Sequence, residues 1–109
     1  MRAVVTVIGK DNVGILHKVS EVCAEMSVNI IEVTQSVLQD MFAMIMLVDI
    51  TDMNRDFAEL VDGMTNLGSK LGLSISLPIT VTTALIKLPP LKIYILIITY
   101  IYRKIKTYY

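Results

Sequence analysis

Hydrophobic residues up to Leu77 recur with two different periods, and the order of these periods predicts six elements. Runs rich in Val, Ile and Thr that alternate with polar residues indicate strands, and apolar residues three and four positions apart indicate helices. Asn12 is a residue type that caps helix starts, and Gln39 and Asp40 form the expected hairpin turn. The predicted elements are a strand at 3–9, a helix at 15–26, strands at 28–38 and 41–50, a helix at 54–71 and a strand at 73–77.

The predicted order, βαββαβ, is that of a ferredoxin-like sandwich, so the fold class is α+β. Right-handed crossovers place both helices on one face of a four-stranded antiparallel sheet. The 41–50 strand has an apolar core face, but its other face, with Ala43, Ile45 and Leu47, is apolar as well. Because a solvated sheet face is normally polar, we expect this second face to meet a partner.

Residues 78–109 differ from the preceding sequence in charge as well as in pattern. Up to Leu77 the chain has five basic and ten acidic residues, a net charge of −5, whereas from Pro78 onward it has five basic residues and no acidic one. Pro78 also cannot donate a hydrogen bond to a sheet. We therefore expect residues 1–77 to form one domain, and residues 78–109 to be an atypical hydrophobic and basic tail outside the fold.

Three interpretations of this tail stand beside one another. Hydrophobic residues make up 54% of the chain, and the uncharged stretch 93–102 contributes strongly to that value. A membrane span takes about 20 apolar residues, so this stretch is too short. An interfacial membrane anchor needs a polar helical face, which is not evident. The bias toward Ile, Lys, Tyr, Leu and Thr is typical of an A/T-rich gene translated out of frame, and composition favours this third interpretation.

The loop between the first predicted strand and helix is the best candidate for a binding site. A helix start offers backbone N–H groups and a positive dipole end, which suit a carboxylate. Asp11 and Asn12 add side-chain oxygens that accept hydrogen bonds from an α-ammonium group, and Gly14 permits close approach. The alternative is a tight, well-capped connection without a ligand, and the loop alone does not distinguish the two.

The same loop resembles the D-x-P-G-[IL] turn that opens ACT domains. Val19–Glu25 resembles the V-S-x-x-x-A-E helix of that family, and the Asn29-Ile30 step fits the start of its second strand. The likeness covers residues 1–77 and is greatest to short, stand-alone bacterial ACT proteins of unassigned role. Val13 departs from the pattern, since many ligand-binding members have proline there to preset the first helical turn.

This resemblance implies a homodimer that binds a small effector, usually an amino acid, between the first loop of one subunit and a strand of its neighbour. The residues implied as ligand-binding are Asp11, Asn12, Val13, Gly14, Ile15 and Leu16 from one subunit, with Asn29 and Ile30 from across the interface.

Other chemistry-bearing residues are better explained by structure. We expect His17 on the surface and Cys23 in the core, without a base beside it. Asp49 and Asp52 could hold a cation, although two carboxylates at a strand end more often cap the next helix. Phosphate-binding loops, zinc-ligand spacings and catalytic triads are not evident in the sequence, which indicates neither an enzyme nor a cofactor. A single cysteine and an N-terminus unlike a signal peptide indicate the cytoplasm.

The leading hypothesis is a cytoplasmic, homodimeric regulatory module that senses an amino acid or a similar molecule and passes its state to a partner protein. One alternative is a protein–protein assembly module whose open sheet face binds a partner and whose first loop stays empty. Another is a membrane-tethered version that uses the tail, although we expect neither a membrane nor a nucleic acid to be the main partner.

Overall fold

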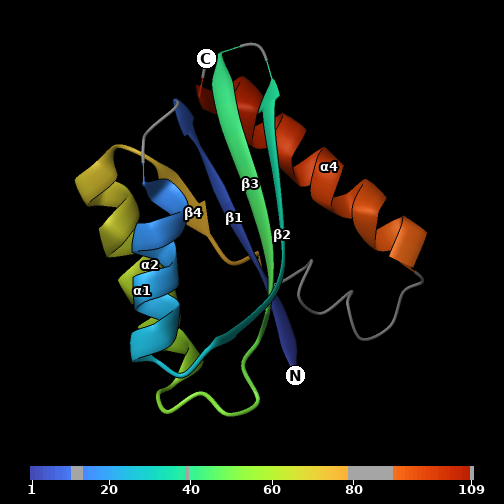
Figure 1. The fold of residues 1–109 in the computed structure, drawn as a ribbon. Helices are drawn as coiled ribbons and strands as arrows, with labels where there is room; N and C mark the ends of the chain where they lie inside the picture. The colour runs from blue at the N-terminus through green and yellow to red at the C-terminus, as the bar shows by residue number, and fades with distance from the viewer. Residues whose placement is uncertain (11–13, 39, 79–89, 109) are drawn as a thin grey trace.

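The computed structural model describes residues 1–10, 14–38, 40–78 and 90–108, and it confirms the predicted α+β sandwich (Figure 1). Four antiparallel strands form one sheet in the order β2-β3-β1-β4, so the first strand of the chain is an inner strand. The six predicted elements are present, with ends that differ by three residues at most. In chain order the elements are β1 (Arg2–Lys10), α1 (Ile15–Glu25), β2 (Asn29–Leu38), β3 (Met41–Asp49), α2 (Phe57–Leu71), β4 (Ser74–Ser76) and α4 (Pro90–Tyr108).

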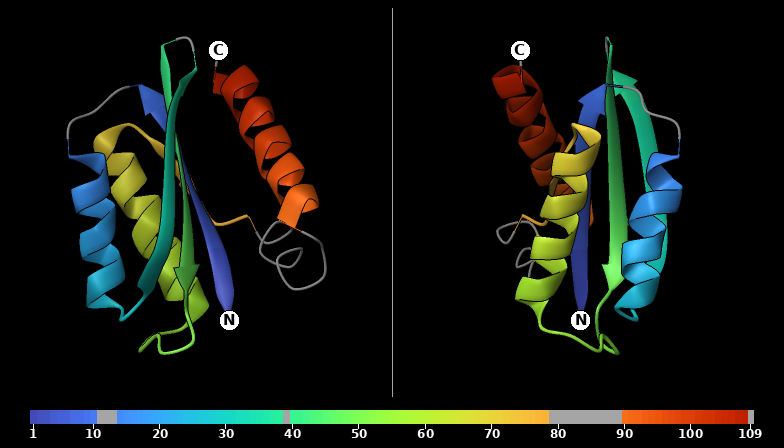
Figure 2. Two further views of the ribbon diagram at one scale, coloured as in Figure 1. Left: turned by 45° about the vertical axis from the view of Figure 1, so that its right-hand side comes forward. Right: turned by 90° about the vertical axis from the view of Figure 1, so that its left-hand side faces the viewer.

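The helices α1 and α2 cover one face of the sheet, as right-handed crossovers require (Figures 1 and 2). Alternate residues of β1 and β3 point to this face: Val5 pairs with Met46 and Val7 with Met44, and all four side chains are fully buried. The main core joins these strand residues to buried side chains of the two helices, among them Val19 and Cys23 of α1 and Leu60 and Met64 of α2.

The opposite face of the sheet is covered by α4, which lies on the other side of the sheet from α1 and α2 (Figure 2). Ile97 and Ile101, one helical turn apart, are 7% and 5% exposed and pack on the sheet. The sheet residues of this second cluster are Val4, Ile8, Met41 and Ala43, with Ile45 and Leu47 partly buried beside them.

This arrangement corrects two expectations from the sequence. The apolar second face of β3 meets a helix of the same chain, and residues 90–108 pack on the fold instead of lying outside it. The sequence pattern does not indicate this helix, because Thr99 and three tyrosines are the polar residues of the uncharged run 93–102 and no charged side chain marks a solvent-facing side within it. No helix in the described part of the chain is long and apolar enough to cross a membrane.

A chain of hydroxyl groups connects α4 to the sheet below it. Tyr100 Oη lies 2.6 Å from Ser76 Oγ on β4, and Ser76 Oγ lies 2.9 Å from Thr6 Oγ1 on β1. Thr6 is only 1% exposed, and its hydroxyl also lies within hydrogen-bond distance of the backbone oxygen of Ser76, at 3.3 Å, so this buried polar side chain is satisfied by β4. The hydrogen bond between Tyr100 and Ser76 thus adds a polar contact to the apolar packing of α4 on the sheet.

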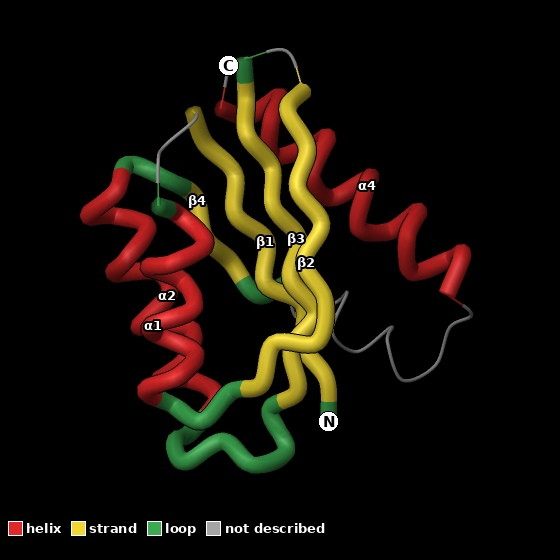
Figure 3. Tube along the Cα trace, viewed as in Figure 1, coloured by secondary structure: helices red, strands yellow, loops and turns green. Residues whose placement is uncertain are grey.

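The close approach of α2 to β4 depends on Gly68. Figure 3 shows β4 following α2 directly, and the turn between them places Gly72 at φ 70°, with Leu73 N–H donating to Gly68 O at 2.9 Å. This is the Schellman arrangement of a helix end. A Cβ built at Gly68 would lie 2.8 Å from the backbone oxygen of Leu73 and 3.3 Å from the nitrogen of Ile75. Any side chain at position 68 would therefore force β4 away from the helix.

Candidate functional site

The candidate site begins at the turn from β1 into α1, at one end of the sheet (Figure 1). Gly14 is the N-cap of α1 and has φ 82°, in the left-handed region that favours glycine. Its carbonyl accepts the first helical hydrogen bond, from Lys18 N–H at 3.1 Å. Apart from its chain neighbours, no described residue lies within 4 Å of a Cβ built at Gly14.

The predicted residues of this turn have different environments. Ile15 is 3% exposed and belongs to the main core, so only its backbone is available to a ligand. Leu16 is 38% exposed and presents an apolar side chain at the helix start. Asp11, Asn12 and Val13 lie outside the described residues. The N-cap position of α1 falls at Gly14, two residues after Asn12, which the sequence favoured as the cap.

Asn29 and Ile30 lie at the opposite end of α1 from this turn, where β2 begins. Asn29 is exposed and pairs with Asp49 of β3, whereas Ile30 pairs with Val48 and packs partly against the main core. The 11 residues of α1 separate the two groups by about 16 Å along the helix. A single chain therefore does not bring them together, and a shared site needs a second copy of the chain.

We compared the sequence and the structure with those of known proteins. The family model of the ACT domain matches residues 2–77. The chain belongs to the ACT domain family. A UPF0237 protein of Methanococcus maripaludis is 44% identical over 73 residues, which are 67% of this chain and 81% of that protein. The resemblance found in the sequence is thus confirmed.

Solved structures agree with this assignment. The structure of an ACT domain protein from Streptococcus pneumoniae matches with a TM-score of 0.67 and 32% identity, over 82% of this chain and 97% of that one. The regulatory subunit of aspartate kinase from Thermus flavus matches with a TM-score of 0.53 and 25% identity, over 70% of this chain and 50% of that one.

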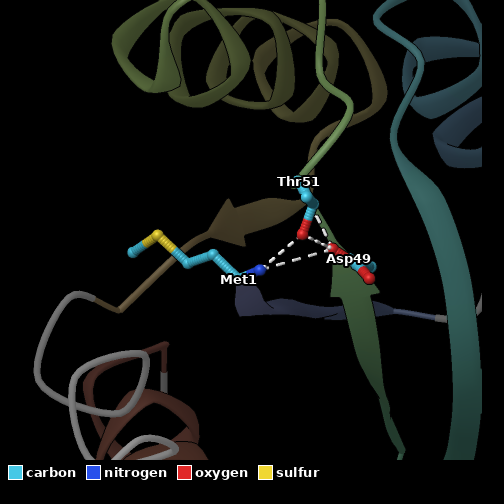
Figure 4. A network of polar contacts seen from close by, with 3 residues as sticks. All are labelled: Met1, Asp49 and Thr51. Carbon is cyan, nitrogen blue, oxygen red and sulfur yellow. Dashed lines mark hydrogen bonds and ion pairs between the residues drawn. The ribbon is translucent and has the colours of Figure 1, made fainter.

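At the Asn29 end of this ACT domain, Asp49 takes part in a structural polar network (Figure 4). Its Oδ1 accepts hydrogen bonds from the backbone N–H of Thr51, at 2.9 Å, and from the Thr51 hydroxyl, and the amino group of Met1 lies 3.6 Å away. The hydrogen bonds from Thr51 hold the pKa of Asp49 below its usual value. Asp49 therefore fixes the end of β3, and no group of three or more His, Cys, Asp or Glu residues suited to a metal occurs among the described residues.

His17 and Cys23 are where the sequence predicted them, on the surface and in the core. The His17 side chain is 79% exposed and its Nε2 lies 3.9 Å from Glu21 Oε1, one turn along α1. Cys23 is 1% exposed, and burial raises the pKa of its thiol to about 11. Neither side chain points to catalysis, since a nucleophilic cysteine requires a lowered pKa and access.

The burial of Cys23 predicts slow alkylation. A thiol pKa of about 11 in place of 9.0 leaves about 100-fold less thiolate near neutral pH, and the core blocks access as well. We expect a thiol reagent to label the native protein at least about 100-fold more slowly than the protein in denaturant. Since the chain has one cysteine, the measured rate belongs to Cys23 alone. Equal rates in the two states would contradict this placement.

Proposed function

We propose that this ACT domain is a non-catalytic regulatory module that binds an amino acid or a similar small molecule at the first turn of α1. The observation that carries the proposal is the helix start, where the exposed Gly14 in the left-handed region leads the chain into α1, and no described residue beyond its chain neighbours lies within 4 Å of a Cβ built there. N–H groups of a first helical turn have no partners within the helix and suit a carboxylate. Asp11 and Asn12, next to this turn in the sequence, supply acceptor oxygens for an ammonium group.

The ligand would lie between two copies of the chain. Asn29 and Ile30 can complete the site only from a neighbouring copy, because α1 separates them from Gly14 within one chain. Binding would act by favouring one arrangement of the two copies, which requires different affinities for the two arrangements. The likeness to the regulatory subunit of aspartate kinase supports a regulatory role. A single buried cysteine is compatible with the reducing cytoplasm, where we place the protein.

A thermal-shift screen of the full chain against each standard amino acid tests the proposal. A ligand present at 100 times its Kd stabilises the native state by about 2.7 kcal/mol. For a domain of this size, that corresponds to a rise in Tm of about 10 °C. We expect such a rise for one or a few chemically related amino acids and none for the rest.

Variants of the first loop separate ligand binding from folding. Asp11→Ala combined with Asn12→Ala should abolish the rise while the unliganded Tm stays unchanged. Asp62→Ala combined with Asn66→Ala is the matched control, since it removes one carboxylate and one amide from exposed positions of α2. An unmutated protein that responds to none of the amino acids would favour the assembly module over the sensor.

A further inference from the structure

The outer surface of α4 carries two parallel rows of unlike chemistry. Ile95, Ile98 and Tyr102 form an apolar row, spaced by three and four residues, and they are 56%, 60% and 58% exposed. The neighbouring row is polar and basic, spaced by seven, four and three residues, and also exposed: Lys92, Thr99, Arg103 and Lys106. Three of the seven large hydrophobic side chains that are exposed among the described residues are therefore on this one helix face.

Contacts within the helix hold this two-row arrangement in place. Lys106 Nζ lies 4.8 Å from the ring centroid of Tyr102, so the charge stands directly beside the apolar row. The Thr99 hydroxyl donates to Ile95 O at 2.8 Å, which satisfies it within the helix. On the inner side, Ile97 and Ile101 are buried on the sheet, so the two outer rows face away from the fold.

Charge also differs between the two sides of the sheet, with basic residues on the side of α4 and carboxylates on the side of α1 and α2. Residues 78–109 include no acidic residue and have a net charge of +5. Figure 2 shows α1 and α2 on the other side of the sheet from α4, and both of these helices have exposed carboxylates. These carboxylates are Glu21 and Glu25 of α1 and Glu59 and Asp62 of α2. The face formed by α4 is thus both the basic side and the apolar side of the molecule.

We propose that the outer face of α4 binds the surface of an anionic lipid bilayer. A helix with an apolar row flanked by basic side chains lies in the headgroup region, with the apolar row inserted and the charges at the lipid phosphates. A second copy fits less well. Two α4 helices would bring their basic rows together, and Leu16 is the only exposed large hydrophobic residue among the described positions of α1 and α2.

Flotation of the full chain with vesicles tests this proposal. We expect binding to vesicles of equal parts phosphatidylglycerol and phosphatidylcholine, and at least tenfold weaker binding to phosphatidylcholine alone. Each basic residue near an anionic surface contributes about 1 kcal/mol, a factor of about five in binding, so Lys92→Glu with Lys106→Glu should weaken binding by at least tenfold. Ile95→Ser with Ile98→Ser should do the same.

Two matched controls use equivalent residues elsewhere on the surface. Lys18→Glu with Lys70→Glu makes the same change in net charge on α1 and α2, on the other side of the sheet. Ile31→Ser with Val37→Ser removes two exposed apolar side chains of β2. Both should bind within twofold of the unmutated chain. Equal binding to neutral vesicles, equal losses in the controls, or no vesicle binding would each overturn the proposal. If vesicles do not bind and Ile95→Ser with Ile98→Ser lowers the mass in sedimentation, a second copy occupies this face.

Discussion

Replacing Ile97 and Ile101 together with aspartate is expected to lower the Tm by about 10 °C or more. Both side chains are buried against the sheet, and each buried isoleucine contributes about 1.5–3 kcal/mol. Two carboxylates cannot be accommodated there without partners, so α4 should leave the sheet and take the Tyr100–Ser76 contact with it. The loss of stability cannot exceed the net free energy with which α4 docks on the sheet, because the helix then leaves. We expect a loss of about 2–3 kcal/mol, and the Tm measured by calorimetry tests it.

The control for this prediction is the same change on the outer side of the helix. Ile95→Asp with Ile98→Asp alters positions that are 56% and 60% exposed, and it should leave the Tm within a few degrees. Deletion of residues 80–109 should match the Ile97 and Ile101 variant, because an undocked helix adds nothing to the fold. It should also promote self-association through the uncovered sheet face. A deletion variant as stable as the full chain would instead place the end of the fold at Leu77, as the sequence analysis expected.

Gly68→Ala is the second change with a large expected effect. The added Cβ would lie 2.8 Å from the backbone oxygen of Leu73, and backbone cannot move aside as a side chain can. Overpacking of this kind costs about 1–3 kcal/mol, and we expect the upper part of that range because β4 has only three residues. The Tm should therefore fall by about 10 °C.

Gly63 provides the comparison within the same helix. A Cβ at position 63 would meet Met26 Cε at 3.1 Å and Val22 Cγ1 at 3.5 Å. The methionine methyl group is the end of a flexible side chain and can shift. Alanine is also favoured over glycine inside a helix by about 1 kcal/mol, so Gly63→Ala should melt at the same temperature or higher. If Gly68→Ala behaved like Gly63→Ala, the tight contact between α2 and β4 would be refuted.

The fold of residues 1–77 could be predicted because each element is encoded locally. Alternation along β3 separates Met44 and Met46, which face the main core, from Ala43, which faces the second cluster. The same alternation indicated that the second face is apolar, from which we expected a partner to cover it. The alternation could not indicate which segment covers the second face, since the covering helix α4 begins more than 40 residues after the end of β3.

The outer face of α4 was missed although its signal is present in the sequence. Lys92, Thr99 and Lys106 recur every seven residues, which places them on one helix face. Two of the three lie outside the uncharged run 93–102, so examination of that run alone hides the polar face. A window over the whole of Pro90–Tyr108 would have included it.

The ligand-binding role of the candidate site stays a prediction, and the structure bears only on where some of its residues lie. Asn12 has the residue type of a helix cap, but the positive φ of Gly14 moves the cap two residues further along. Ile15 was assigned to the ligand through the family resemblance, yet its position on the helix directs its side chain into the core. Asn29 and Ile30 need a neighbouring copy to reach the first turn, and one chain's sequence contains no pattern that specifies how two copies meet.

The inner position of β1 has a consequence for the synthesis of the chain. β1 leaves the ribosome before both of its pairing partners, because Arg2 pairs with Asp49 of β3 and Thr6 pairs with Ser76 of β4. At about 5–20 residues per second, roughly 2–9 s pass before β3 is complete, and β4 follows later still. During that time seven consecutive residues that are buried in the native structure, several of them β-branched, have no strand to pair with. Among the strands of this sheet, the one that pairs with both β3 and β4 thus waits longest for its partners and is open to intermolecular association during that time.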